Sequence, residues 1–327
     1  MVSRRSIVRT ITGAVAGSIA LAGRSLAETV TPAGQKRARP PRTVSAPTTL
    51  TVRANRSAIG AAGVPGRLEP SVRLLEKRLG AVSLADIGAV SGTGRIAGDR
   101  LVGGTVVAIG SLDPDAIRYE LRRRSFTAAG SRANFERFVS RDGRIAVGHR
   151  GSTIVLGYGP GTALDTVDAR LGVREATATS RTHRRTPPAG IRQLERVLDG
   201  DAITAVALGP TSSDVLSTVL AEESSPFASL VGAVDAIGAG ATVREGSGRT
   251  ALQYGFVGDP DRLSTDRVRA ALDDADTSVD TVRTGSLERD GRTIVVNADC
   301  STDRLVDANL NALRIDPSTV DRRRRTD

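Results

Sequence analysis

The stretch NFERFVSRDGRIAVGHRGSTIVLGYG, residues 134–159, decides the fold class because it holds three apolar runs joined by very short polar turns. The pair Asp142-Gly143 between the first two runs is a strong signal for a type I′ hairpin turn. Strands joined by turns this short run antiparallel. The stretch therefore predicts three consecutive strands of an antiparallel sheet.

Strand and helix patterns alternate along the rest of the chain. The elements predicted before residue 173 are a strand at 48–54, a helix at 68–80, a hairpin at 86–112 and helices at 113–126 and 162–172. The order then recurs in outline, with helices at 190–200 and 212–223, a strand at 202–208, a long hairpin around 244–249, a helix within 258–275 and a hairpin at 281–299.

Two short motifs occur twice and suggest an internal duplication. Asp-Pro-Asp stands at 113–115 and 259–261, each time at a predicted helix start, and Arg-Asp-Gly-Arg stands at 141–144 and 289–292, each time between two predicted strands. A repeated β-β-α-β-β unit accounts for both motifs. Convergence remains the alternative, because Asp-Gly turns and Asp-Pro caps are common choices for any hairpin and helix.

These patterns predict the α+β class, built as two tandem lobes of mainly antiparallel sheet with helices packed on one face. We place the lobes at 48–172 and 189–312, with a polar linker at 173–188 between them. Residues 313–327 read as a basic, disordered tail that could touch anionic surfaces weakly.

The first 27 residues have the three parts of an export signal. Arg4 and Arg5 belong to a basic head, a short apolar middle follows, and Ser25-Leu26-Ala27 offers a cleavage site after Ala27. The apolar middle is too short to span a bilayer, which needs about 20 residues, so we expect no transmembrane helix. Residues 28–47 are rich in Pro and basic residues and predict a flexible linker.

The order SRRSIVR at residues 3–9 resembles the twin-arginine consensus S-R-R-x-F-L-K. ALAGR at 20–24 resembles the lipobox of twin-arginine lipoproteins of haloarchaea, but Arg24 stands where the lipid-bearing Cys would be. The chain thus resembles uncharacterised, twin-arginine-exported haloarchaeal proteins. The resemblance implies export of a folded protein after transient contact with the export machinery, an extracellular or cell-envelope location and no acyl anchor, and it carries no known activity.

The net charge of +10 is concentrated at the chain ends. Residues 1–42 carry eight basic residues and one acidic residue, whereas residues 43–315 carry 34 basic and 32 acidic residues. A nearly neutral body with no Trp and only eight Phe and Tyr residues lacks the clustered cations and stacking rings that nucleic-acid binding uses. The composition therefore predicts no nucleic-acid partner.

Catalytic and metal-binding patterns are missing from the sequence. The two histidines, His149 and His183, read as surface or turn residues, and neither stands near a Ser in a nucleophile elbow. Cys300 is the single cysteine, and we expect it to be a partly buried strand residue. No zinc or calcium ligand spacing is present. The sequence favours a protein that is not an enzyme and uses neither a metal nor a cofactor.

One glycine-rich loop is a candidate anion site. Gly157, Gly159 and Gly161 follow a predicted strand and precede a helix that begins at Thr162, where free backbone N–H groups could hold an anion or a nucleotide. A purely structural turn is the alternative, because the Lys of a P-loop is absent and Pro160 removes one donor. The leading expectation is an exported, non-catalytic protein that acts by binding or structural contact, and a binder or enzyme using this loop is the runner-up.

Overall fold

The computed structural model describes residues 48–62, 84–97, 100–171, 188–208, 230, 232–276 and 282–302. The strands are β1 (Thr48–Asn55), β2 (Ile87–Ala97), β3 (Arg100–Gly110), β4 (Thr127–Arg132), β5 (Phe135–Val139), β6 (Ile145–Arg150), β7 (Thr153–Tyr158), β8 (Ala202–Ala207), β9 (Val234–Arg244), β10 (Arg249–Gly258), β11 (Val282–Asp290) and β12 (Thr293–Ser301). The helices are α3 (Arg56–Ala62), the 3₁₀ turn η1 (Leu84–Asp86), α5 (Pro114–Arg123), α6 (Ala163–Arg170), α7 (Ala189–Val197) and α10 (Thr265–Asp276).

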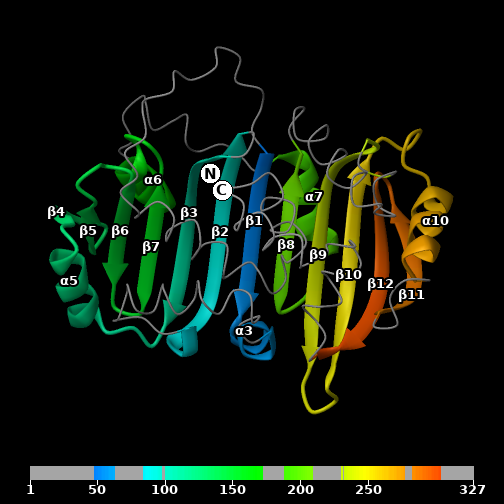
Figure 1. The fold of residues 1–327 in the computed structure, drawn as a ribbon, viewed down its shortest axis with the longest axis horizontal. Coiled ribbons are helices and arrows are strands. Elements are labelled where there is room, and N and C mark those ends of the chain that lie inside the picture. Colours follow the sequence, from blue (N-terminus) through cyan, green and yellow to red (C-terminus); the bar gives the residue numbers. More distant parts are fainter. Residues whose placement is uncertain are drawn as a thin grey trace, which may run out of the picture.

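The strands form one sheet in the order β11-β12-β10-β9-β8-β1-β2-β3-β7-β6-β5-β4, and every neighbouring pair is antiparallel (Figure 1). The α+β class and the predicted antiparallel pairing are confirmed. The sequence ranges expected to form two lobes share this sheet, because β1 pairs with β2 on one side and with β8 on the other. β4 is a strand that the sequence analysis missed.

The predicted export signal, both linkers, the basic tail and the helices at 68–80 and 212–223 lie outside the described residues. The start of α5 is as expected: Pro114 is its first residue, and the Asp113 carboxylate accepts hydrogen bonds from the N–H groups of Asp115 and Ala116. The second Asp-Pro-Asp forms a turn instead. α10 begins six residues after Asp259, at Thr265, and the Ser264 hydroxyl accepts the Arg267 N–H there.

Helices pack on both faces of the sheet, so the expectation of one covered face is wrong. In β6 and β7, Ala146 and Val155 pack against α6, whereas Val147 and Ile154 pack against α5. Successive strand residues point to opposite faces, and both sets are apolar here. We call the two surfaces the α6–α7 face and the α5–α10 face after the helices that cover them.

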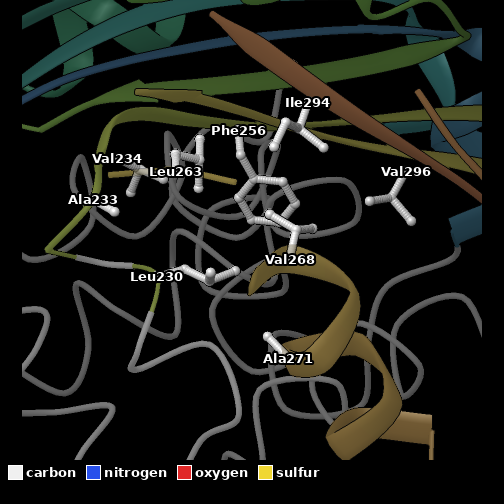
Figure 2. Packing of buried hydrophobic residues seen from close by; sticks show 9 residues of the cluster. All are labelled: Leu230, Ala233, Val234, Phe256, Leu263, Val268, Ala271, Ile294 and Val296. Atoms are coloured by element: carbon white, nitrogen blue, oxygen red, sulfur yellow. The ribbon is translucent and has the colours of Figure 1, made fainter. Parts of the chain in front are cut away.

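The α5–α10 face holds one of the buried clusters of the second half, and another lies under α7. Phe256 of β10 and Ile294 of β12 pack against Val268 of α10, and all nine members of this cluster are buried (Figure 2). Figure 1 shows α5 and α10 near opposite ends of the sheet. The two amphipathic helices thus cover corresponding ends of one face.

The two halves of the sheet repeat the same strand order and register outward from the β1–β8 pair. β1-β2-β3-β7-β6 on one side corresponds to β8-β9-β10-β12-β11 on the other. The corresponding residues have corresponding partners: Ala108 lies between Val90 and Ile154, and Phe256 lies between Ile237 and Ile294. β4 and β5 have no counterpart and extend the first half at its edge.

This register corrects the assignment made from Arg-Asp-Gly-Arg. Residues 141–144 lie between β5 and β6, neither of which pairs with β3, whereas residues 289–292 join β11 to β12, which pairs with β10. The structural counterpart of the second turn is the β6–β7 turn at Gly151. The sequence after it agrees, since Gly-Ser-Thr-Ile-Val at 151–155 corresponds to Gly-Arg-Thr-Ile-Val at 291–295.

Candidate functional site

Two helices cover the outer parts of the α6–α7 face and leave central strands between them. α6 packs on β3, β5, β6 and β7, and α7 packs on β8, β9, β10 and β12. Figure 1 shows β1 and β2 between these two helices. One row of directly paired residues crosses this face from α7 to α6: Gly238, Ala205, Thr51, Thr93, Thr105 and Gly157.

Polar side chains occupy this central part of the face. Residues that alternate along β1, β2 and β3 share the face with α6 and α7 because the side-chain period of a strand is two. They form a group that we call the hydroxyl–arginine strip: Thr49, Thr51, Arg53, Ser91, Thr93, Arg95 and Thr105. A mostly apolar sheet thus carries hydroxyl groups and guanidinium groups at its centre.

The strip is positively charged. Arg53 is exposed and Arg95 is partly exposed, and neither forms an ion pair with another described residue. A third guanidinium comes from α6, where Arg170 Nη2 donates to the Ser91 hydroxyl at 3.3 Å. The three strands contribute no carboxylate to this face, so its charge is not neutralised from within the strip.

Three strip positions have small counterparts in the second half. Following the repeated register, Ser91 corresponds to Gly238, Thr93 to Gly240 and Arg53 to Ala205, whereas Thr51 and Thr105 correspond to the larger Ile203 and Gln253. A Cβ atom at Gly238 would lie 2.6 Å from Leu198 Cδ1 at the end of α7 and 2.9 Å from the Thr204 carbonyl oxygen, so this close packing favours glycine there. The first half has hydroxyl and arginine side chains in the place where the second half accommodates a helix.

This arrangement is suited to binding oxyanions. Guanidinium groups form charge-assisted hydrogen bonds with carboxylate, sulfate or phosphate oxygens, and the more exposed hydroxyls, such as that of Thr93, can donate to the same groups. Thr51 is buried, and its hydroxyl donates to the Ala205 carbonyl oxygen. Arg53 lies opposite Ser91, and Arg95 lies four residues further along β2, which separates the two cations by about 13 Å along the strands. The spacing favours an extended ligand with two negative groups over a single small ion.

The predicted anion loop is filled by its own chain. A Cβ at Gly157 would lie 2.5 Å from the Ala163 carbonyl oxygen, and one at Gly159 would lie 2.6 Å from Thr162 Oγ1. Gly161 has a φ of 73°, and the Thr162 side chain makes no cap hydrogen bond at the start of α6. Gly157 is explained by the close packing of α6 on β7, Gly159 by its contact with Thr162, and Gly161 by its positive φ. Anion binding at this loop stays a prediction.

His149 is buried, so the expectation of a surface or turn histidine is wrong. Its ring stacks on Phe138 with centroids 5.8 Å apart, and its Nε2 lies 3.4 Å from Glu136 Oε2. Arg118 Nε and Nη2 hold the same carboxylate at 2.9 and 2.8 Å. Burial lowers the pKa of His149 although Glu136 opposes the shift, and neutral imidazole therefore packs within the α5–α10 face. His183 lies outside the described residues.

Among the described residues, Cys300 and the carboxylates do not form a metal-binding group. Cys300 is a buried thiol in β12, as expected of a small apolar strand residue. Across the residues that the structure describes, no group of three or more His, Cys, Asp or Glu side chains could hold a metal ion. Within the same residues, no helix is both long and apolar enough to cross a bilayer.

The strip was missed from the sequence although its pattern is visible there. TTLTVRA at 48–54 places Thr, Thr and Arg at alternate positions, and SGTGR at 91–95 does the same with Ser, Thr and Arg. Alternation indicates a polar face on each strand. What the sequence lacks is the pairing of these strands, which are separated by a loop and a helix pattern.

Comparisons with known proteins leave the family open. No family model and no curated protein matches the chain. A solved structure described as "Structure of crystal form I of TP0453" is similar over 83% of this chain and 95% of that chain, with 11% sequence identity and a TM-score of 0.41.

Proposed function

We propose that this is an exported, non-catalytic envelope or extracellular protein that binds an extended anionic ligand along the hydroxyl–arginine strip. The observation that carries the proposal is the contrast between the halves: the second half has Gly238 beneath the end of α7 and Gly240 beneath Asp199, which follows it, whereas the first half has Ser91 and Thr93. The first half lacks the glycines that allow close packing here and has hydrogen-bond donors in their place, which packing alone does not readily explain.

The strip supplies binding energy through a few charged contacts on a flat surface. Charge-assisted hydrogen bonds are roughly twice as strong as neutral ones, and the two unpaired guanidiniums of Arg53 and Arg95 need not break an ion pair with a described residue first. Contacts between exposed charges are screened by salt over about 8–10 Å at 0.1–0.15 M ionic strength. Binding should therefore weaken steeply as salt increases.

The strip is tested by calorimetric titration with tetragalacturonate, a tetrasaccharide that carries carboxylates along its length, and with neutral maltotetraose. We expect the wild-type protein to bind only the first. Arg53→Gln combined with Arg95→Gln should weaken binding at least tenfold, because both anchoring cations are lost. The matched control is Arg141→Gln with Arg249→Gln, which removes the same charge at exposed positions outside the strip.

Three outcomes would count against the strip. Undetectable binding of tetragalacturonate and of inorganic tripolyphosphate would refute it, and so would equal losses in the two double variants. If tripolyphosphate binding were instead lost in Thr162→Asp alone, the site would be the loop at Gly157, Gly159, Gly161 and Thr162. That loop is the alternative anion or nucleotide site, and its support is the start of α6 without a side-chain cap.

Export is part of the proposal and rests on residues 1–27. Replacing Arg4 and Arg5 by lysine should retain the tagged protein inside the cell with its signal uncleaved, because the twin-arginine receptor reads the guanidinium pair. Cell fractionation and N-terminal sequencing measure this. Wild-type-like release of mature protein, starting at Glu28, from the double variant would disprove the twin-arginine route.

We also propose that the sheet arose by internal duplication, as two tandem units that meet at the β1–β8 pair. Support comes from the repeated register around Ala108 and Phe256 and from the shared Gly-x-Thr-Ile-Val at 151–155 and 291–295. An origin by convergence would not require matching register in three successive strand pairs. Related sequences that lack β4 and β5 but keep both units would agree with this origin. Relatives in which one unit is kept and the other is replaced by an unrelated sequence would oppose it.

A further inference from the structure

A histidine is buried on the α5–α10 face near the outer end of the first half. His149 of β6 is 3% exposed, and neither of its ring nitrogens makes a hydrogen bond with another described residue. Ile154 of β7 lies beside it on one side, and the Phe138 ring of β5 stacks on it from the other. Buried polar atoms are normally hydrogen-bonded, so two ring nitrogens without such a bond mark an unusual position.

The charged groups that face His149 come from β5 and α5. Its Nε2 lies 3.4 Å from Glu136 Oε2, but Arg118 of α5 already donates to both oxygens of that carboxylate. Arg118 also pairs with Asp115 on its own helix, and Arg122 adds a further positive charge to α5 near Glu136. β7 contributes no charged side chain. The imidazole therefore lies beside an ion pair that is complete without it.

The corresponding position in the second half is not buried. By the repeated register His149 corresponds to Arg289 of β11, since His149 pairs with Ile154 and Arg289 pairs with the counterpart residue Ile294. Arg289 is exposed, because β11 is the last strand at its end of the sheet. The β4–β5 extension of the first half has no counterpart there. This extension adds Glu136 and Phe138 next to β6 and so encloses the histidine.

A proton on His149 would place a second cation next to Arg118 in a space closed to water. Burial lowers the pKa of His149, and Glu136 opposes this shift without cancelling it. A buried imidazolium ion needs an acceptor or water, and the carboxylate within its reach is held by Arg118. The protonated ring is therefore accommodated when Arg118 releases Glu136 or when water enters beneath α5. Either change loosens α5.

We propose that His149 is an acid-sensitive switch that releases α5 from strands β5, β6 and β7. In the opened state the histidine has its ordinary pKa of about 6.5. Because its pKa in the closed state is lower, the opened state binds the proton more tightly. The contribution of His149 to closure is thus fully present above about pH 6.5 and is lost as the pH falls below that value.

Two features make the response local to α5. Glu136 stays ionised in this pH range, because Arg118 holds the pKa of that carboxyl below its usual range. Release of α5 exposes an apolar cluster that includes Ile117, Leu121 and Phe138. α10, on the same face near the other end of the sheet, packs on a cluster that contains no histidine.

Hydrogen exchange measured by mass spectrometry at pH 7.5 and 5.0 tests the switch in the full chain, with rates corrected for the intrinsic effect of pH. We expect α5 to lose protection by about fivefold or more at the lower pH, whereas α10 keeps its protection. His149→Gln is neutral at both pH values and should reduce the change in α5 to that of α10. The matched control, His183→Gln, should retain it. Equal loss in α5 and α10, or an unchanged loss in His149→Gln, would overturn the proposal.

The histidine ring provides a second measurement that does not require its replacement. In untagged His183→Gln protein, His149 is the single histidine, so its Hε1 resonance is assigned directly. We expect this resonance to titrate below the ordinary value of about 6.5, over the pH range in which α5 loses protection. Titration at or above that value would refute the switch. His149 and the hydroxyl–arginine strip lie on opposite faces of the sheet, so failure of the strip as a binding site leaves both results unaffected.

Discussion

Replacing Phe256 with alanine is expected to lower the free energy of unfolding by about 3–5 kcal/mol, the usual cost of removing a buried aromatic ring. Phe256 is 4% exposed and lies between strand β10 and helix α10, next to Val268 and Ile294 (Figure 2). The ring is the largest side chain of this cluster, so its loss leaves a cavity that α10 cannot close without moving. Urea unfolding followed by far-UV circular dichroism measures the change.

Tyr119→Ala is the control for the Phe256 substitution. Tyr119 lies on α5 and is 68% exposed, so its truncation removes an aromatic ring that packs little against the core. We expect the control to change the free energy of unfolding by less than about 0.5 kcal/mol, as is usual for surface substitutions. If Phe256→Ala lowered the free energy of unfolding as little as Tyr119→Ala does, α10 would not pack on β10 and β12 as described.

Gly157→Ala is expected to destabilise the protein by about 1–3 kcal/mol, the typical cost of inserting a methyl group into a filled space. The added Cβ would lie 2.5 Å from the Ala163 carbonyl oxygen and 2.8 Å from Val167 Cγ2. The first contact is with backbone, so relief requires α6 to move away from β7 as a unit. Thermal unfolding monitored by circular dichroism measures the loss.

Gly60→Ala serves as the matched glycine control. Gly60 lies in α3, and a Cβ there would meet nothing within 4 Å. Because alanine is the better helix former, we expect this variant to be more stable by about 0.5–1 kcal/mol. If Gly157→Ala were also neutral or stabilising, α6 would not lie against β7, and the free backbone at 157–162 would again be open to an anion.

The local elements followed from the sequence where a turn or cap had specific chemistry. Asp113 and Pro114 predicted the start of α5, and Asp142-Gly143 predicted the β5–β6 hairpin, because both depend only on neighbouring residues. The second Asp-Pro-Asp did not start α10, because Ser264 provides the cap closer to the apolar stripe of that helix. A short polar motif predicts a turn more securely than it predicts which element follows.

The candidate site could not have been assembled from the sequence alone. Thr51 and Thr93 are separated by 42 positions, and only the β1–β2 register places them side by side. His149 similarly read as a turn residue, although Phe138 and Glu136 of the neighbouring strand enclose it. Cross-strand neighbours are decided by pairing between distant segments, and this information is absent from local patterns.

The sequence by itself determined the antiparallel α+β class, the hairpins and most helix positions, because periodicity, glycine turns and caps act within a few residues. Only the tertiary structure decided that β1 joins β8, that helices cover both faces and that Arg53 and Arg95 lie on one face of the sheet between α6 and α7. These features depend on which strands pair and in which register. A one-residue slip would turn every side chain of a strand to the opposite face.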